Sequence, residues 1–292
     1  RRHGRVPRRQ AAVDTVEGKV AYQADDVERS LAYVGVCSVD GVMEGSETVK
    51  KAVTIKNGRD QSWDLDSHGF TRVDDVPELL DFYNERAICL DYYPQCERLV
   101  QKVTGASKVF AFYHTVRSHS SIPGARKRRK QGFPVEDPAG CVHVDYSEAC
   151  AARAARQLAK PPNLWQDPRP LLGFKPFLDM GEIDEHLRNG KRWAIVNLWR
   201  NLSPEPVQRT PVALCVGTSI STDDIVTVQS VAGATRQVKE YYFTGCSEDH
   251  EWVYFPQMKR EEAILIKNWD SAGEAFADKK CNERVPSTFA LH

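Results

Sequence analysis

The sequence predicts a mainly β fold with flanking helices. Six strand-like segments follow one another in the second half, separated by short links rich in turn residues. They cover residues 193–199, 212–216, 225–228, 238–243, 251–255 and 263–269. Helical patterns cluster instead in the first half and directly after residue 146. This arrangement predicts an antiparallel sandwich or barrel with helices at its edge.

The first half begins with short strands and continues into helices. Short strands are expected at 20–22, 31–36, 53–56 and within 64–70. The Asn57-Gly58 pair favours a tight turn after the third of them. Apolar residues at helical spacing predict a helix over 76–84. A second helix is expected over 94–103, because Pro94 suits a first turn and Gly105 suits the position after the last.

The middle of the chain alternates strands and helices around one long loop. Residues 108–115 are β-branched and aromatic, which predicts a strand, and a second strand is expected over 140–146. The loop over 117–138 carries a basic cluster at 127–130, which we interpret as a solvated charge run. Helices are expected over 148–160, capped by Ser147, and over 180–188.

Composition excludes several classes of protein. Lys+Arg and Asp+Glu are 40 each among 292 residues, and this zero net charge argues against a dedicated nucleic-acid binder. No apolar run approaches the ~20 residues of a membrane helix, and the Arg-rich N-terminus lacks the apolar core of a signal peptide. The eight cysteines form no C-x-x-C pair, which argues against zinc held by paired thiolates. We expect reduced thiols and a cytoplasmic protein without a membrane partner.

One tripeptide has the pattern of a metal site. His143 and Asp145 lie two residues apart on an expected strand, so their side chains point to the same face. An imidazole and a carboxylate on one strand face can supply two neighbouring metal ligands. Two histidines with one carboxylate bind Fe(II) on one side and leave positions open for cosubstrate and dioxygen.

The third ligand is expected to come from a distant strand. Three histidines follow the tripeptide: His186, His250 and His292. His186 falls in an expected surface helix, and His292 is the last residue and is expected to be mobile. His250 precedes an expected strand, so the sequence favours His143, Asp145 and His250 as the metal ligands and catalytic centre.

Seven segments taken in order resemble a known family. They are Asp64–Phe70, Thr104–Ala106, Phe112–Arg117, Val142–Ser147, Val196–Leu202, His250–Met258 and Glu262–Ser271. The chain resembles the AsaB-type hydroxylase/desaturase family of fungal and bacterial secondary metabolism, which includes a gibberellin desaturase and cephamycin-type methoxylase subunits. The resemblance covers roughly residues 50 to 290.

The resemblance implies a double-stranded β-helix, a cupin-like jelly roll, with non-haem Fe(II)/2-oxoglutarate oxygenase chemistry. It implies a single domain over 1–292, in which 1–105 pack on a jelly-roll core over 106–292. The iron ligands carried over are again His143, Asp145 and His250. One departure stands out. The family usually ends in an Arg followed by a segment like Pro-His-Thr-Ala-Phe, whereas after Arg284 this chain reads Pro286-Ser287-Thr288-Phe289-Ala290, without that histidine.

The cosubstrate 2-oxoglutarate needs a basic partner for its distal carboxylate. Three candidates are Lys267 on the last strand, Arg284 at the family's terminal Arg, and Arg200 at the end of a strand. Asn197, on the strand that ends at Arg200, is a further cofactor-binding candidate. The other expected cosubstrate is O2, with ascorbate as an activator.

The expected substrate is a small natural-product intermediate, amino-acid-derived or carboxylated, that is hydroxylated, desaturated or oxidatively cyclised. The candidate substrate-binding residues are polar or aromatic and lie on or beside strands: His114, Arg117, Tyr146, Trp199, Phe243 and Trp252. Two other interpretations stay open: a cupin-like Zn or Mn hydrolase or isomerase that uses the same three ligands, and a binding module with an inactive site. The oligomeric state is expected to be a monomer or a homodimer.

Overall fold

The computed structural model describes residues 14–24, 29–34, 43–44, 47–74, 76–77, 81–119, 135–162, 169–173, 175–232, 238–273 and 288–292. The basic cluster at 127–130 and the anchor candidate Arg284 lie outside these ranges. Within them, no helix is long and apolar enough to cross a membrane. The described chain is mainly β, as the sequence predicts.

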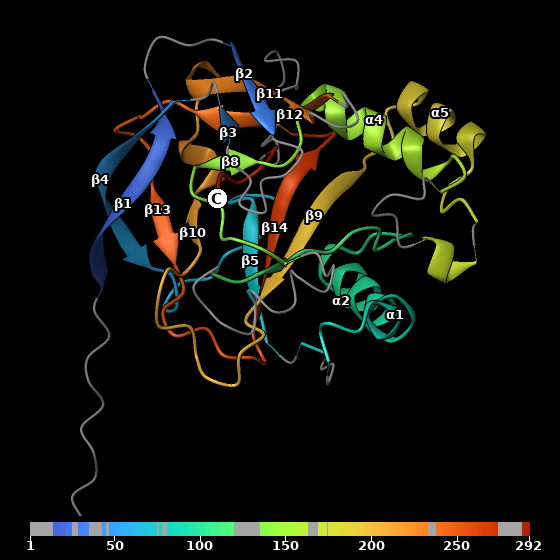
Figure 1. Cartoon of the computed structure of the whole chain (residues 1–292), viewed down its shortest axis with the longest axis horizontal. Coiled ribbons are helices and arrows are strands. Elements are labelled where there is room, and N and C mark those ends of the chain that lie inside the picture. The colour runs from blue at the N-terminus through green and yellow to red at the C-terminus, as the bar shows by residue number, and fades with distance from the viewer. Residues whose placement is uncertain are drawn as a thin grey trace, which may run out of the picture.

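Three sheets surround the centre of the molecule (Figure 1). The first has the order β1 (Thr15–Gln23), β4 (Thr48–Asn57), β13 (Trp252–Tyr254) and β10 (Ala213–Cys215). The second has the order β3 (Met43–Glu44), β2 (Arg29–Val34), β11 (Ile225–Ala232), β12 (Val238–Thr244) and β8 (His143–Val144). The third joins β5 (Phe70–Val73), β14 (Ala263–Asp270) and β9 (Ala194–Arg200). A separate pair consists of β6 (Val116–Arg117) and β7 (Val135–Glu136).

Strands from the first 105 residues belong to these same sheets. β4 pairs with β13, β2 with β11, and β5 with β14, so each of the three sheets combines early and late strands. This differs from the expected division into an N-terminal layer over 1–105 and a core over 106–292. Backbone hydrogen bonds, which alternating side-chain patterns do not encode, decide which strands are neighbours.

The helices lie on one side of the sheets, where Figure 1 shows α4 and α5 apart from α1 and α2. The described α-helices are α1 (Glu85–Ala87), α2 (Tyr93–Thr104), α4 (Glu148–Leu158) and α5 (Met180–Arg188), with a π-helical turn over Ile88–Tyr92. The Ser147 hydroxyl accepts a hydrogen bond from the Cys150 amide at 3.2 Å, which starts α4 directly after the His143–Asp145 segment. Single 3₁₀ turns cover Arg169–Leu172, Gly217–Ser219 and Thr222–Asp224.

Three sequence-predicted elements are not present as expected. The strand expected within 64–70 is a turn up to Gly69, and β5 begins only at Phe70. Residues 108–115 form no strand, although their composition favours one, because no described strand pairs with them before β6 begins at Val116. The described part of 76–84 is not helical, and the helix begins instead at Glu85, where the Asn84 side chain accepts a hydrogen bond from the Ala87 amide. The Asn84 cap therefore places the helix start later than the apolar spacing suggests.

The last five residues cross the interior between sheets. The Ala290 amide donates to the Lys267 carbonyl at 3.0 Å, and the Cys215 amide donates to the Leu291 carbonyl at 2.8 Å. Phe289, Ala290 and Leu291 are each at most 5% exposed. Gly69 makes room for this segment, because its φ is +83° and a Cβ there would lie 3.0 Å from the Ala290 side chain. The chain therefore ends at the centre of the fold (Figure 1).

Candidate metal centre and its pocket

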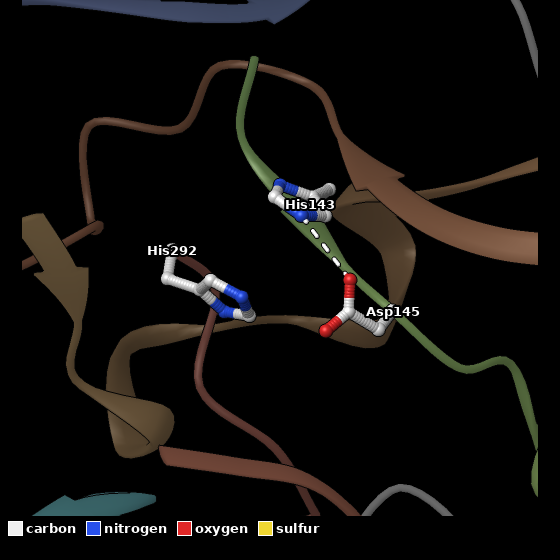
Figure 2. A group of neighbouring side chains, drawn as sticks. All are labelled: His143, Asp145 and His292. Atoms are coloured by element: carbon white, nitrogen blue, oxygen red, sulfur yellow. Dashed lines mark ion pairs between the residues drawn. The ribbon is translucent and has the colours of Figure 1, made fainter. Parts of the chain in front are cut away.

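Three potential metal ligands converge at the end of β8. One nitrogen or oxygen atom from each of His143, Asp145 and His292 lies within 4.8 Å of the others, and no second such group occurs in the described ranges. Figure 2 shows the three side chains turned toward a shared space. His143 Nε2 lies 3.3 Å from Asp145 Oδ1. The expected placement of His143 and Asp145 on one face of a strand is what brings this pair together.

Backbone hydrogen bonds place His292 at this centre. The His143 amide donates to the His292 carbonyl at 3.0 Å, and the His292 amide donates to the His143 carbonyl at 3.2 Å. Residues that exchange both backbone bonds lie directly opposite one another, so their side chains project side by side. The two imidazole centroids are 4.7 Å apart. The C-terminal segment thus acts as a neighbouring strand that supplies the third group.

Both histidines present the same nitrogen to the centre. His143 Nδ1 lies 3.0 Å from the Cys141 carbonyl, and His292 Nδ1 lies 3.2 Å from the Ala290 carbonyl. A carbonyl only accepts, so each Nδ1 carries the hydrogen and donates it. Each Nε2 is then unprotonated in the neutral ring and available as a metal ligand.

The charges of the centre suit a divalent cation. Burial and the neighbouring His143 lower the pKa of His292 to about 4, so its ring is neutral near neutral pH. Burial opposes ionisation of Asp145, but the neighbouring His143 ring and a hydrogen bond from Asn197 hold its pKa well below the usual range. Two neutral imidazoles and one carboxylate form a donor set typical of non-haem iron, and the same set accepts Zn or Mn. The residues present fit such a metal.

The structure does not bring His250 to this centre. His250 precedes β13 in the first sheet, and its side chain is fully buried. Its ring stacks on Tyr22 with centroids 5.8 Å apart, and its Nε2 lies 3.6 Å from Asp224 Oδ2. The expectation that His250 is the third ligand is therefore replaced by His292. Separation along the chain does not predict the third ligand here, because backbone pairing with β8 decides which histidine lies beside His143 and Asp145.

A large open pocket contains the three ligands. It is lined by His143, Asp145 and His292 together with aromatic and apolar residues of β12 and β9. Phe243 lies directly opposite His143, so its side chain shares the face that carries the ligands, and Tyr241 follows on that face. Both pack on the valines opposite them in β11, Val226 and Val228. One wall of the pocket beside the ligands is therefore apolar and aromatic.

The other candidate substrate residues fall in different surroundings. Tyr146 follows Asp145 and packs with Ala151 and Trp269. His114 lines the pocket and its Nδ1 lies 2.7 Å from the Tyr93 hydroxyl, and Trp199 packs partly buried against the core beside the pocket. Trp252 is 2% exposed and donates to the Tyr22 hydroxyl at 2.7 Å, so it is chiefly a core residue.

The expected cosubstrate residues also differ in their surroundings. Asn197 donates to Asp145 Oδ2 at 2.7 Å and so contacts a metal-ligand candidate directly. Lys267 is 2% exposed, and its Nζ lies 2.8 Å from Asp270 Oδ2. Arg200 donates to the carbonyls of Pro77 and Arg260 and to the Tyr92 hydroxyl. Both cations therefore already have acidic or carbonyl partners.

Sequence reasoning missed two groups at the centre. The terminal position of His292 predicts a mobile residue, although the family's histidine after the terminal Arg is a signal for it, since His292 is the next histidine after Arg284. Asn268 had no signal in the sequence; its Oδ1 accepts a hydrogen bond from the Asp145 amide at 3.1 Å. A contact of this kind depends on the register of β14, which the sequence does not reveal.

Comparisons with known proteins agree with this geometry. A family model described as the oxidoreductase/YMDC permease-like domain matches residues 21–168 and 175–288. The chain belongs to this family. The resemblance to AsaB-type enzymes is confirmed by its relatives, among them the hydroxylase/desaturase asaB of Aspergillus flavus, 32% identical over 36% of this chain and 48% of asaB.

Other relatives match this chain over most of its length. The alpha-ketoglutarate-dependent dioxygenase phiK of a fungal species (strain ATCC 74256) is 27% identical over 82% of this chain and 78% of phiK. Among solved structures, the iron and alpha-ketoglutarate-dependent endoperoxidase NvfI superposes with a TM-score of 0.68 at 23% identity, covering 96% of this chain and 89% of NvfI. The likeness to NvfI confirms the double-stranded β-helix fold expected for the chain.

Proposed function

We propose that this protein is a non-haem Fe(II)/2-oxoglutarate-dependent dioxygenase of secondary metabolism. The observation that carries the proposal is the convergence of His143, Asp145 and His292, with each histidine Nδ1 within hydrogen-bond distance of a backbone carbonyl so that Nε2 is left for a metal. The family and its relatives, which include dioxygenases and hydroxylase/desaturases, support the same chemistry. Three protein ligands on one side leave positions for 2-oxoglutarate and O2.

Iron bound with 2-oxoglutarate and O2 supplies an oxidant that removes hydrogen from a C–H bond. The chain's own part is to hold the ligands and the substrate. Carbonyl acceptors at Cys141 and Ala290 fix the orientation of the two imidazole rings. The wall formed by Tyr241 and Phe243 orients an apolar part of the substrate beside the centre and limits access of water there.

A carboxylate group on 2-oxoglutarate or on the substrate needs a cation in the pocket. Arg117 ends β6, lines the pocket, and keeps 39% of its side chain exposed. Its Nη1 donates to the Asp137 carbonyl at 2.9 Å and lies 3.5 Å from Glu136, so the guanidinium retains further donors. We place Arg117 first as a carboxylate partner. Arg200, Arg284 and Lys267, the sequence-based candidates for the 2-oxoglutarate anchor, rank after Arg117.

These surroundings support one class of substrate. An apolar wall and a cation suit a small natural-product intermediate with a carboxylate, of the kind derived from an amino acid. Hydroxylation, desaturation and oxidative cyclisation all begin with removal of hydrogen from such a molecule. The role of ascorbate as activator, the cytoplasmic location and the monomeric or homodimeric state stay sequence-based predictions.

The deciding experiment measures metal and cosubstrate together. Purified protein is loaded anaerobically with Fe(II), Zn(II) or Mn(II), and 2-oxoglutarate binding is followed by calorimetry and by the visible charge-transfer absorption of the iron complex. The samples are then exposed to O2 with ascorbate and a suitable substrate. Of the three metals, only Fe(II) should support conversion of 2-oxoglutarate to succinate. A product one oxygen atom heavier than its substrate identifies hydroxylation, and one lacking two hydrogens identifies desaturation or ring closure. Hydrolase or isomerase turnover with Zn(II) or Mn(II), without succinate, would overturn the proposal.

A further inference from the structure

The carboxylate of Asp145 is held from two neighbouring strands. Asn197 on β9 donates from its Nδ2 to Asp145 Oδ2 at 2.7 Å, which is a short, charge-assisted hydrogen bond. Asn268 on β14 accepts the Asp145 main-chain N–H at 3.1 Å. One amide therefore fixes the side chain of the ligand and the other fixes its backbone.

The strand register explains why both amides reach one residue. Asn197 lies opposite Ile266 in the β9–β14 pair, and the register shifts between Lys267 and Trp269. A bulge of this kind leaves one residue out of the ladder and redirects its side chain. Asn268 is that residue, and it is fully buried. The irregularity thus supplies a second amide at the position of the metal centre.

The bond from Asn197 also distinguishes the two carboxylate oxygens. Oδ2 is occupied by the amide, whereas Oδ1 faces His143 Nε2 at 3.3 Å. Without the amide, nothing described in the structure would hold Oδ2, and the carboxylate could rotate about its Cβ–Cγ bond. Rotation would change both the distance and the number of oxygens offered to a metal.

We propose that Asn197 and Asn268 are positioning residues that hold Asp145 so that Oδ1 is offered to the metal. The inference rests on the proposed metal site, and it adds a role for two residues outside the ligand set. Outer partners of metal ligands typically change metal affinity or activity by about 10- to 100-fold when they are replaced. Asn197 is the more direct of the two, since it contacts the ligating group itself.

The test uses Co(II), whose visible absorption reports ligand geometry and needs no turnover. Asn197→Ala should weaken Co(II) binding about 10- to 100-fold and alter the absorption spectrum. Asn197→Leu, which restores side-chain volume without a donor, should behave in the same way. Asn201→Ala is the matched control, because Asn201 is a buried amide just beyond β9 that donates to the Glu205 and Met258 carbonyls and not to Asp145. It should bind Co(II) as the unmodified protein does.

Circular dichroism and thermal unfolding without metal establish that each variant is folded. If Asn197→Leu does not fold, the test compares Asn197→Ala with Asn201→Ala. Recovery of affinity in Asn197→Leu would assign the residue a packing role and overturn the inference. Equal losses in Asn197→Ala and Asn201→Ala, or no loss in either, would overturn it too. Failure of the unmodified protein to bind Co(II) would instead contradict the proposed metal site, so the two failures are distinguishable.

Discussion

His143 and His292 exchange both of their backbone hydrogen bonds, at 3.0 and 3.2 Å. Each ring also donates its Nδ1–H to the backbone carbonyl two residues earlier in the sequence. The two imidazoles are therefore placed by the same local geometry on two adjacent segments. A metal centre with this construction depends on the C-terminal segment as much as on β8.

The first prediction separates the two histidines proposed as third ligand. His292→Ala should abolish Co(II) and Fe(II) binding, because it removes one of three protein ligands. His250→Ala should keep metal binding and lower the free energy of unfolding by about 2 kcal/mol, since its fully buried side chain leaves a cavity. Calorimetric metal titration and urea unfolding measure the two quantities. Loss of metal in His250→Ala with retention in His292→Ala would restore the sequence-based assignment.

The second prediction concerns acid stability. Burial lowers the pKa of His250 below its ordinary value of 6.5, although Asp224 and Asp249 act in the opposite direction. The groups packed around the ring, Tyr22 and Trp252, are uncharged near neutral pH. The unfolded chain therefore binds the proton more tightly, so the stabilising contribution is present above pH ~6.5 and is lost as the pH falls below it.

Replacement of the ring tests this dependence. His250→Gln should make the free energy of unfolding of metal-free protein depend less steeply on pH between about 6.5 and 5, measured by urea denaturation. The metal-ligand histidines are unchanged in both proteins, so their titration cancels in the difference. An unchanged slope would mean that His250 does not contribute to acid unfolding.

Much of the fold could be predicted, because strands of the second half carry alternating or continuous apolar patterns. Residues 263–269, for example, correspond to β14, all of which is buried. The site could be predicted only in part. The pair His143 and Asp145 depends on spacing two residues apart, which a strand converts directly into proximity. His292 depends on a backbone pairing across almost 150 residues, and Asn268 depends on a bulge. Neither is encoded in local periodicity.

The third prediction concerns a buried carboxylate between β13 and β14. Glu262 accepts hydrogen bonds from Arg59 at 2.7 and 3.0 Å and from Arg72 at 2.7 Å. Burial opposes ionisation, but the hydrogen bond from Arg59 and the charges of both arginines lower the pKa of Glu262 from 4.5 to about 2. The stabilisation is thus complete above pH ~4.5 and is lost as the pH falls toward 2.

Glu262→Gln should lower the free energy of unfolding at pH 7 by about 2 kcal/mol, less than for a fully buried pair because the arginines are about a quarter exposed. The variant should also lose less stability than the unmodified protein between pH 4.5 and 3. Denaturant titrations at both pH values measure the change. Equal acid sensitivity of the two proteins would show that Glu262 titrates normally.

The last prediction compares two basic residues of the pocket. Arg117→Ala should raise the KM for 2-oxoglutarate or for the substrate about tenfold, since an unpaired carboxylate in a partly buried site is costly. It should leave stability within about 0.5 kcal/mol, because Arg117 is an exposed side chain. Lys267→Met should lower stability by about 3 kcal/mol, since it removes the buried cationic partner of Asp270 and leaves Arg192 as its remaining ion-pair partner among the described residues.

Separate titrations of 2-oxoglutarate and substrate show which carboxylate Arg117 binds, because only the KM of its own partner rises in Arg117→Ala. Lys267 is buried and paired through Asp270 and Asp66, and it lies opposite Val196, on the other face of the β9–β14 pair from Asn197. A cation directed away from Asp145 should not reach a ligand bound at the metal. A stable Lys267→Met variant whose KM for 2-oxoglutarate alone rises tenfold would contradict this placement and identify Lys267 as the anchor.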